Sequence, residues 1–179
     1  MLLPHSAINT RLLAHPATSH SVAQSIAVHT VFQSDGALRL TYHITARPAQ
    51  LSIPAPCPPS FTDGLWQHTC LEVFVATPGE EAYREFNFSP SGQWAAYAFH
   101  AYRQRNPDFS PALAPQISIS HRTDGLTLEA LLPAALLPQA EGSAELQLGL
   151  SAIIEDNSGD LSYWALAHPA ERPDFHHHT

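Results

Sequence analysis

The sequence of 179 residues contains no lysine, and charged residues make up only 13 % of it. Sixteen prolines against eight glycines argue against long helices. No apolar run approaches the ~20 residues of a membrane-spanning helix, and the first residues lack the pattern of a secretory signal. Two cysteines, Cys57 and Cys70, are too few for a disulfide framework. These absences predict a reduced, cytoplasmic protein.

The charges that are present are unevenly distributed. Residues 1–66 carry three arginines and two acidic residues, whereas residues 67–179 carry five arginines and fourteen acidic residues. The whole chain has a net charge of −8. An acidic surface repels phosphate backbones and anionic lipid headgroups. We therefore expect neither a nucleic-acid partner nor a membrane partner.

Short segments of alternating apolar and polar residues dominate the chain. At 37–44 this alternation indicates a half-buried strand, and 34–36 (Ser-Asp-Gly) predicts a hairpin turn after a strand at 25–32. Residues 47–64, with five prolines, predict a long surface connection, and 133–138 one helical turn. Further strands are expected at 70–76, 82–89, 93–100, 117–121, 125–132, 146–155 and 161–167. Many short strands separated by turns predict an all-β sandwich or barrel, and the length fits a single domain.

Ten of the sixteen aromatic residues lie between Trp66 and Phe109. Side chains two positions apart share one face of a strand. We assign one face of each strand in this region to the core: Leu71, Val73 and Val75; Phe86 and Phe88; Tyr97 and Phe99. The opposite face then carries Glu72, Phe74, Tyr83, Glu85, Asn87, Trp94, Ala96, Ala98 and His100.

This second, mixed face has two interpretations. An indole ring beside small alanines is open for stacking on a pyranose, and carboxylates and amides accept hydrogen bonds from its hydroxyls. The candidate ligand-binding residues of the face are then Trp94, Glu72, Glu85, Asn87 and His100. The alternative is that another chain segment covers the face. Its acids would then pair with Arg84, Arg103 or Arg105, as buried acids usually do.

Two aromatic-containing pairs extend the candidate site. Tyr102 and Arg103 follow the strand at 93–100, and the guanidinium is suited to clamp a carboxylate or phosphate. A structural ion pair with Glu72, Glu85 or Asp174 is the simpler role for Arg103. Tyr163 and Trp164 offer a second aromatic platform, but alternation turns one ring inward, and we expect this to be Trp164.

Asp174 and His176 complete the set of candidate site residues. In an extended segment they face the same way, as an acid and an imidazole do near a metal or in a general base. The alternative is a buried hydrogen bond between them that fixes the end of the chain. His177 and His178 carry no weight in this interpretation.

Two motifs resemble a known family. Residues 65–74 (LWQHTCLEVF) resemble the opening motif of DOMON-like domains and of family 9 carbohydrate-binding modules, and residues 83–94 (YREFNFSPSGQW) continue it. The segments at 162–166, 168–169 and 173–176 resemble a bacterial branch of DOMON-like proteins. The resemblance covers about residues 25–178. It implies one jelly-roll-like β-sandwich domain, spanning 1–179, that binds a sugar or haem without catalysis.

Haem and calcium are the alternatives among cofactors. DOMON cytochromes hold haem iron between Met and His, but Met1 is the only methionine, which leaves ligation by two of His100, His168 and His176. The segment 156–160 carries oxygen ligands as a calcium loop does, yet it lacks the distal glutamate, and a hairpin turn explains it better. We therefore expect no cofactor and no metal site.

Catalysis and protein interaction are the alternatives among functions. A glycosidase would use Glu72 and Glu85 as its carboxylate pair, but the resemblance is to non-catalytic domains, and no nucleophile motif is present. An interaction domain would pair with another chain, including a second copy, through this face or a sheet edge. An open edge is expected because the relatives continue with a further short segment after the His176 region.

Overall fold

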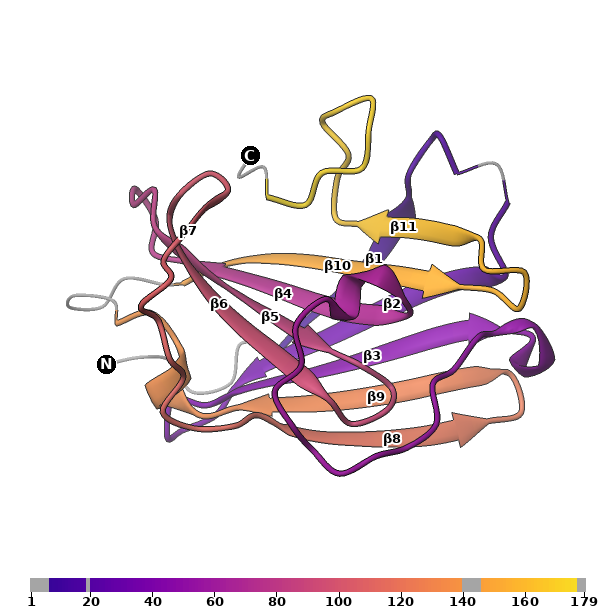
Figure 1. Ribbon diagram of the computed structural model, residues 1–179, viewed down its shortest axis with the longest axis horizontal. Coiled ribbons are helices and arrows are strands. Elements are labelled where there is room, and N and C mark those ends of the chain that lie inside the picture. The colour runs from indigo at the N-terminus through magenta and orange to yellow at the C-terminus, as the bar shows by residue number, and fades with distance from the viewer. Residues whose placement is uncertain (1–6, 19, 140–145, 177–179) are drawn as a thin grey trace.

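The computed structural model describes residues 7–18, 20–139 and 146–176, which form eleven β-strands and three short 3-10 helices (Figure 1). The strands are β1 (Ala7–Ala14), β2 (Ala23–Phe32), β3 (Leu38–Ala46), β4 (Cys70–Ala76), β5 (Tyr83–Phe88), β6 (Trp94–Ala101), β7 (Gln104–Arg105), β8 (Gln116–Arg122), β9 (Gly125–Leu132), β10 (Gln147–Glu155) and β11 (Leu161–Ala165). The 3-10 helices are η1 (Pro48–Gln50), η2 (Leu65–Gln67) and η3 (Ala134–Leu136). Within these residues no helix is long and apolar enough to cross a membrane.

The strands form two antiparallel layers that are joined by β1. One layer has the order β8-β9-β3-β2-β1, and the other has the order β7-β6-β5-β4-β10-β11. The first six residues of β1 pair with β2, whereas Leu13 and Ala14 pair with β11. Figure 1 shows β3, β9 and β8 below the second layer. The predicted all-β antiparallel sandwich is confirmed.

The main hydrophobic core lies between the two layers. Leu40 and Ile26 are buried on the first layer, and Leu71 and Phe86 are buried on the second. The hydroxyl of Tyr42 crosses the core and donates a hydrogen bond of 2.7 Å to the backbone oxygen of Glu72. This bond satisfies a fully buried hydroxyl, and it ties β3 to the strand that carries Glu72.

Nine strands were predicted from the sequence, and each is confirmed with its ends within two residues. The hairpin turn at 34–36 and the helical turn within 133–138 are confirmed as well. The two strands that were missed are β1 and β7. Most of β1 is exposed and only its Leu12 is buried, so β1 lacks the alternation that marks a strand. β7 has two residues, too few for any periodicity.

Candidate functional site

The candidate site lies on the outer face of the second layer, the face turned away from the core. Directly opposed residues of an antiparallel sheet share a face, so the strand register shows which side chains belong to this outer face. One row across the sheet is Ser151, Glu72, Asn87 and Ala95, and the next is Gly149, Phe74, Glu85 and Tyr97. The two carboxylates are therefore diagonal neighbours on adjacent strands.

A cavity of ≈ 370 Å³ opens on this face. Six aromatic side chains line it: Trp66, Phe74, Tyr97, Phe99, Tyr163 and Phe175. The ionisable side chains of the lining, apart from the tyrosines, are Glu72, Glu85, Arg103, Arg105 and His176. The sheet supplies the floor, while Trp66 comes from η2 and Phe175 from the segment after β11. This volume lies within the range of small-molecule binding sites.

Glu72 and Glu85 are both buried, with 3 % and 6 % of their surface exposed. The hydroxyl of Ser151 donates to Glu72 at 2.8 Å, and the amide of Asn87 donates to Glu85 at 2.8 Å. Burial and the neighbouring Glu85 charge raise the pKa of Glu72 to about 8, against the effect of the Ser151 bond. Burial also raises the pKa of Glu85 to about 7, against the effects of the Asn87 bond and the nearby arginines.

The arginines of the cavity lie at its rim, each beside an aspartate. Arg103 donates to Asp174 at 3.0 Å. Arg105 lies 3.8 Å from Asp63, and its guanidinium stands over the Tyr97 ring at 4.1 Å from the ring centre. The expected structural role of Arg103 is thus confirmed for Asp174. Of the three arginines considered as partners of the buried acids, none forms an ion pair with Glu72 or Glu85 within the described residues, and Arg84 donates to the backbone oxygen of Leu136.

Residues 173–176, which we call the strap, lie across the outer face of the sheet. His176 Nδ1 shares a 2.8 Å hydrogen bond with the Tyr83 hydroxyl. Asp174 accepts hydrogen bonds from Tyr102 and Arg103, and also from the backbone N–H of His176 at 3.1 Å. Asp174 and His176 thus attach the strap to β5 and to the turn between β6 and β7. Covering of the face by another segment was one of the two expected interpretations, and it is confirmed in part, since the cavity stays open beside the strap.

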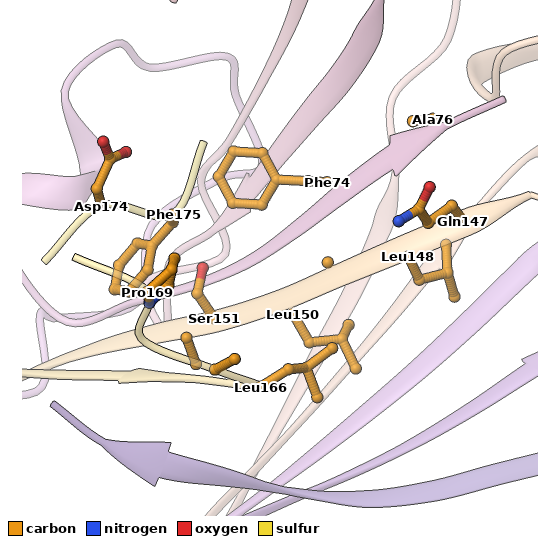
Figure 2. Close-up of a pocket in the computed structure, with 13 residues that line it drawn as sticks. Phe74, Ala76, Gln147, Leu148, Leu150, Ser151, Leu166, Pro169, Asp174 and Phe175 are labelled. Atoms are coloured by element: carbon orange, nitrogen blue, oxygen red, sulfur yellow. The ribbon is translucent and has the colours of Figure 1, made fainter. Parts of the chain in front are cut away.

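The strap separates two cavities. A second, smaller one of ≈ 130 Å³ lies on its other side, against β10 and the segment after β11. Figure 2 shows Phe74 and Phe175 at one end of this smaller cavity and Gln147 and Leu148 at the other. Because Phe74 and Phe175 line both cavities, their rings form the boundary between them. The surface of the smaller cavity is about equally polar and apolar, and the carboxylate in its lining is that of the half-buried Asp174.

The predicted orientation of β6 is wrong, because the face that was assigned to the site points into the core. Trp94 is directly opposite Phe88 and lies in the core between the layers, with 7 % of its surface exposed. Tyr97 and Phe99, which were assigned to the core, face the cavity instead. His100 shares the phase of Trp94 and is exposed to solvent. Trp94 and His100 are therefore not brought to the site, and the aromatic surface there comes from other rings.

The remaining predicted residues divide into two groups. Glu72, Glu85, Arg103, Tyr163 and His176 line the larger cavity. The others lie outside its lining: Asn87 is buried beside both carboxylates, Tyr102 and Asp174 hold the strap, and Trp164 is buried in the core, as alternation predicted. Of the three histidines considered for haem, only His176 is in the lining, while His168 contacts the Leu13 backbone oxygen at 2.7 Å.

The sequence analysis missed Trp66, Phe175 and Arg105 as lining residues. Trp66 lies in a one-turn helix and Phe175 in an irregular segment, and neither has a periodic pattern that reveals its direction. Trp66 nevertheless stands inside the 65–74 motif, which was a usable signal. The 156–160 segment is the hairpin turn between β10 and β11, where Asp156 accepts from the N–H groups of Ser158 and Asp160. Met1, His177 and His178 lie outside the described residues.

Replacing Arg103 by alanine is expected to loosen the strap. The substitution removes the ion pair with Asp174, and backbone amide exchange over 174–176 should rise several-fold. The melting temperature should change little, because an ion pair with a half-exposed arginine stabilises by only ~1 kcal/mol or less. Arg122→Ala is the matched control, since it removes an Arg–Asp bond of the same 3.0 Å length in the hairpin between β8 and β9. Unchanged exchange at 174–176 in Arg103→Ala would contradict this role.

Two solved structures share this fold. A protein from Bacteroides uniformis, described as a candidate carbohydrate-binding protein, is 13 % identical, with a TM-score of 0.65 over 94 % of this chain and 81 % of its own. A family 9 carbohydrate-binding module from Caldicellulosiruptor kristjanssonii, in complex with cellotriose, is 12 % identical, with a TM-score of 0.52 over 83 % of this chain and 67 % of its own. No protein-family model and no curated protein matches the sequence. The chain therefore has the fold of carbohydrate-binding modules, whereas its resemblance to DOMON-like domains stays a prediction.

Proposed function

We propose that this chain is a non-catalytic carbohydrate-binding domain and that the sugar occupies the larger cavity. One observation carries the proposal: an open cavity of ≈ 370 Å³ combines six aromatic side chains with two buried carboxylates. Pyranose rings have apolar faces that pack on aromatic rings, and their hydroxyls donate to carboxylates. The shared fold with a module that holds cellotriose supports the same class of ligand.

Trp66 is the residue that we expect to stack on the sugar. It lines the cavity, it is 40 % exposed, and its ring and that of Tyr97 meet edge to face with 6.2 Å between the ring centres. A rigid, half-exposed indole loses little conformational entropy when a ligand packs on it. Glu72 and Glu85 then fix the orientation of the sugar at the floor.

Trp66→Ala is expected to weaken the binding of cellotriose at least ~10-fold in a calorimetric titration, about 1.4 kcal/mol, as the loss of a central aromatic contact does. The fold should survive, because Trp66 lies on a surface helix. Phe61→Ala is the control: it removes a ring that is 46 % exposed, close to the 40 % of Trp66, but that does not line the cavity. Cellotriose recovered uncleaved after the titration would agree with a non-catalytic domain. Equal affinity in Trp66→Ala and the wild type would place the sugar elsewhere.

A further inference from the structure

From the charges and hydrogen bonds of the cavity floor we infer that the ligand is an amino sugar, whose protonated amine lies between Glu72 and Glu85. This inference rests on the proposed carbohydrate function and names the class of sugar. The cavity floor contains more hydrogen-bond acceptors than there are donors of the protein to satisfy them. An ammonium group brings three N–H donors and a positive charge, whereas a sugar hydroxyl brings one donor and no charge.

An ionised Glu72 carboxylate would have no cation of the protein to balance its charge. In the described part of the chain its hydrogen-bond partner is the neutral Ser151 hydroxyl, and no ion pair of Glu72 is present. The two rim arginines lie beside Asp174 and Asp63. His176 Nε2 is 3.9 Å from Glu85, while its Nδ1 is engaged with Tyr83. Burying an ionised carboxylate without a partner is costly, so in the protein alone the raised pKa of Glu72, about 8, keeps its carboxyl largely protonated at pH 7. A cationic ligand would favour the ionised form by pairing with it.

Asn87 provides an independent sign of a missing donor. Its side chain is fully buried, and its Nδ2 donates to Glu85. Among the residues that the structure describes, Asn87 Oδ1 is the one buried side-chain nitrogen or oxygen atom without a hydrogen-bond partner. Asn87 stands directly opposite Glu72 in the register, so this unfilled acceptor lies in the same group as both carboxylates. Buried acceptors without a donor are rare in proteins, so the group formed by Asn87 and the two carboxyls has an acceptor to spare, and a protonated Glu72 is the nearest source of a donor within the protein.

The aromatic rings beside the carboxylates favour a cation as well. Phe74 and Tyr97 are the residues directly opposite Glu85 on its two neighbouring strands, and both line the cavity. The face of an aromatic ring attracts a cation, and the attraction strengthens where water is excluded. An ammonium group at Glu85 would therefore contact a carboxylate and lie beside two rings. A neutral sugar would satisfy only the stacking part of this arrangement.

Three trisaccharides that differ only at carbon 2 test the inference: cellotriose with a hydroxyl, the glucosamine trimer with an ammonium, and the N-acetylglucosamine trimer with an amide. In calorimetric titrations at pH 7 the glucosamine trimer should bind at least ~10-fold more tightly than cellotriose. Glu72→Gln and Glu85→Gln should each reduce that ratio toward one. Glu129→Gln, which removes an exposed carboxylate from β9 of the other layer, should leave it unchanged.

The outcomes separate this inference from the proposed function. If cellotriose or the N-acetylated trimer binds as tightly as the glucosamine trimer, the amine inference is overturned and carbohydrate binding stands. If no trisaccharide binds, both are overturned. A preference for the amine that survives in both glutamine variants would also overturn the assignment to Glu72 and Glu85. Both variants replace a carboxyl with an amide of the same shape, and near-ultraviolet circular dichroism confirms that each is folded.

Discussion

Replacing Trp94 by alanine is expected to lower the free energy of unfolding by about 3–5 kcal/mol, the usual cost of removing a large buried aromatic side chain. Trp94 lies in the core between the layers, opposite Phe88, and Phe61 contacts it edge-on with 5.6 Å between the ring centres. For a protein of this size the melting temperature should fall by roughly 10 °C or more. Thermal unfolding followed by far-ultraviolet circular dichroism measures the effect.

Trp66→Ala provides the contrast to this prediction. The same loss of an indole at a half-exposed surface position should change the melting temperature by only a few degrees, while it weakens sugar binding. The two tryptophans thus separate stability from binding. A Trp94→Ala variant that melts like the wild type but no longer binds cellotriose would contradict the core position of Trp94.

The stability of the protein is expected to fall as the pH rises from about 5 to 8.5. In the folded state the pKa of Glu72 is raised from 4.5 to about 8, and that of Glu85 to about 7. Between pH 4.5 and 8 the folded state therefore binds more protons than the unfolded state, so the free energy of unfolding decreases with increasing pH. The stabilisation is fully present below the unfolded pKa and is lost as the pH passes the folded pKa values.

A shift of about three pKa units in one carboxyl corresponds to roughly 4 kcal/mol, or about 10 °C in melting temperature for a protein of this size. Glu72→Gln should flatten the profile, because the glutamine stays neutral at every pH, and above pH 8 the variant should be more stable than the wild type. Glu129→Gln, with an exposed side chain, is the control and should retain the wild-type slope. Melting temperatures measured at steps of half a pH unit test this dependence. A wild-type profile that is flat from pH 5 to 8.5 would show that the two carboxyls ionise freely in the folded state.

The order of the strands along the chain could be predicted from the sequence because most strands have one buried face. Alternation therefore located nine strands, and it placed Trp164 correctly in the core. The failure at β6 has a physical reason: both faces of this strand are covered, one by the core between the layers and one by the site. Aromatic residues occupy both faces, so hydrophobicity does not identify the inner one.

The turn before β6 indicates which face of this strand points to the core, although the alternation of its residues does not. Ser89 and Gln93 close the turn, with the Ser89 N–H donating to the Gln93 oxygen at 2.9 Å. A hairpin turn sets the register of its strands, which places Trp94 opposite Phe88 and on the same face. Since Phe88 was already assigned to the core, this register would have assigned Trp94 to the core as well. The positions of the strap and of Trp66 could not be predicted in this way, because irregular segments are positioned by tertiary contacts alone.

Two walls of the larger cavity come from positions that are far apart in the sequence. Trp66 precedes β4 and Phe175 follows β11, so the stretch that joins these two walls contains every strand from β4 to β11. Closing so long a stretch has an entropic cost that must be offset by contacts formed elsewhere. Contacts of such large sequence separation are typical of slowly folding proteins. The two walls are held in place only through the sheet between them, so a change that unfolds any part of that sheet is expected to take the ligand-binding site with it.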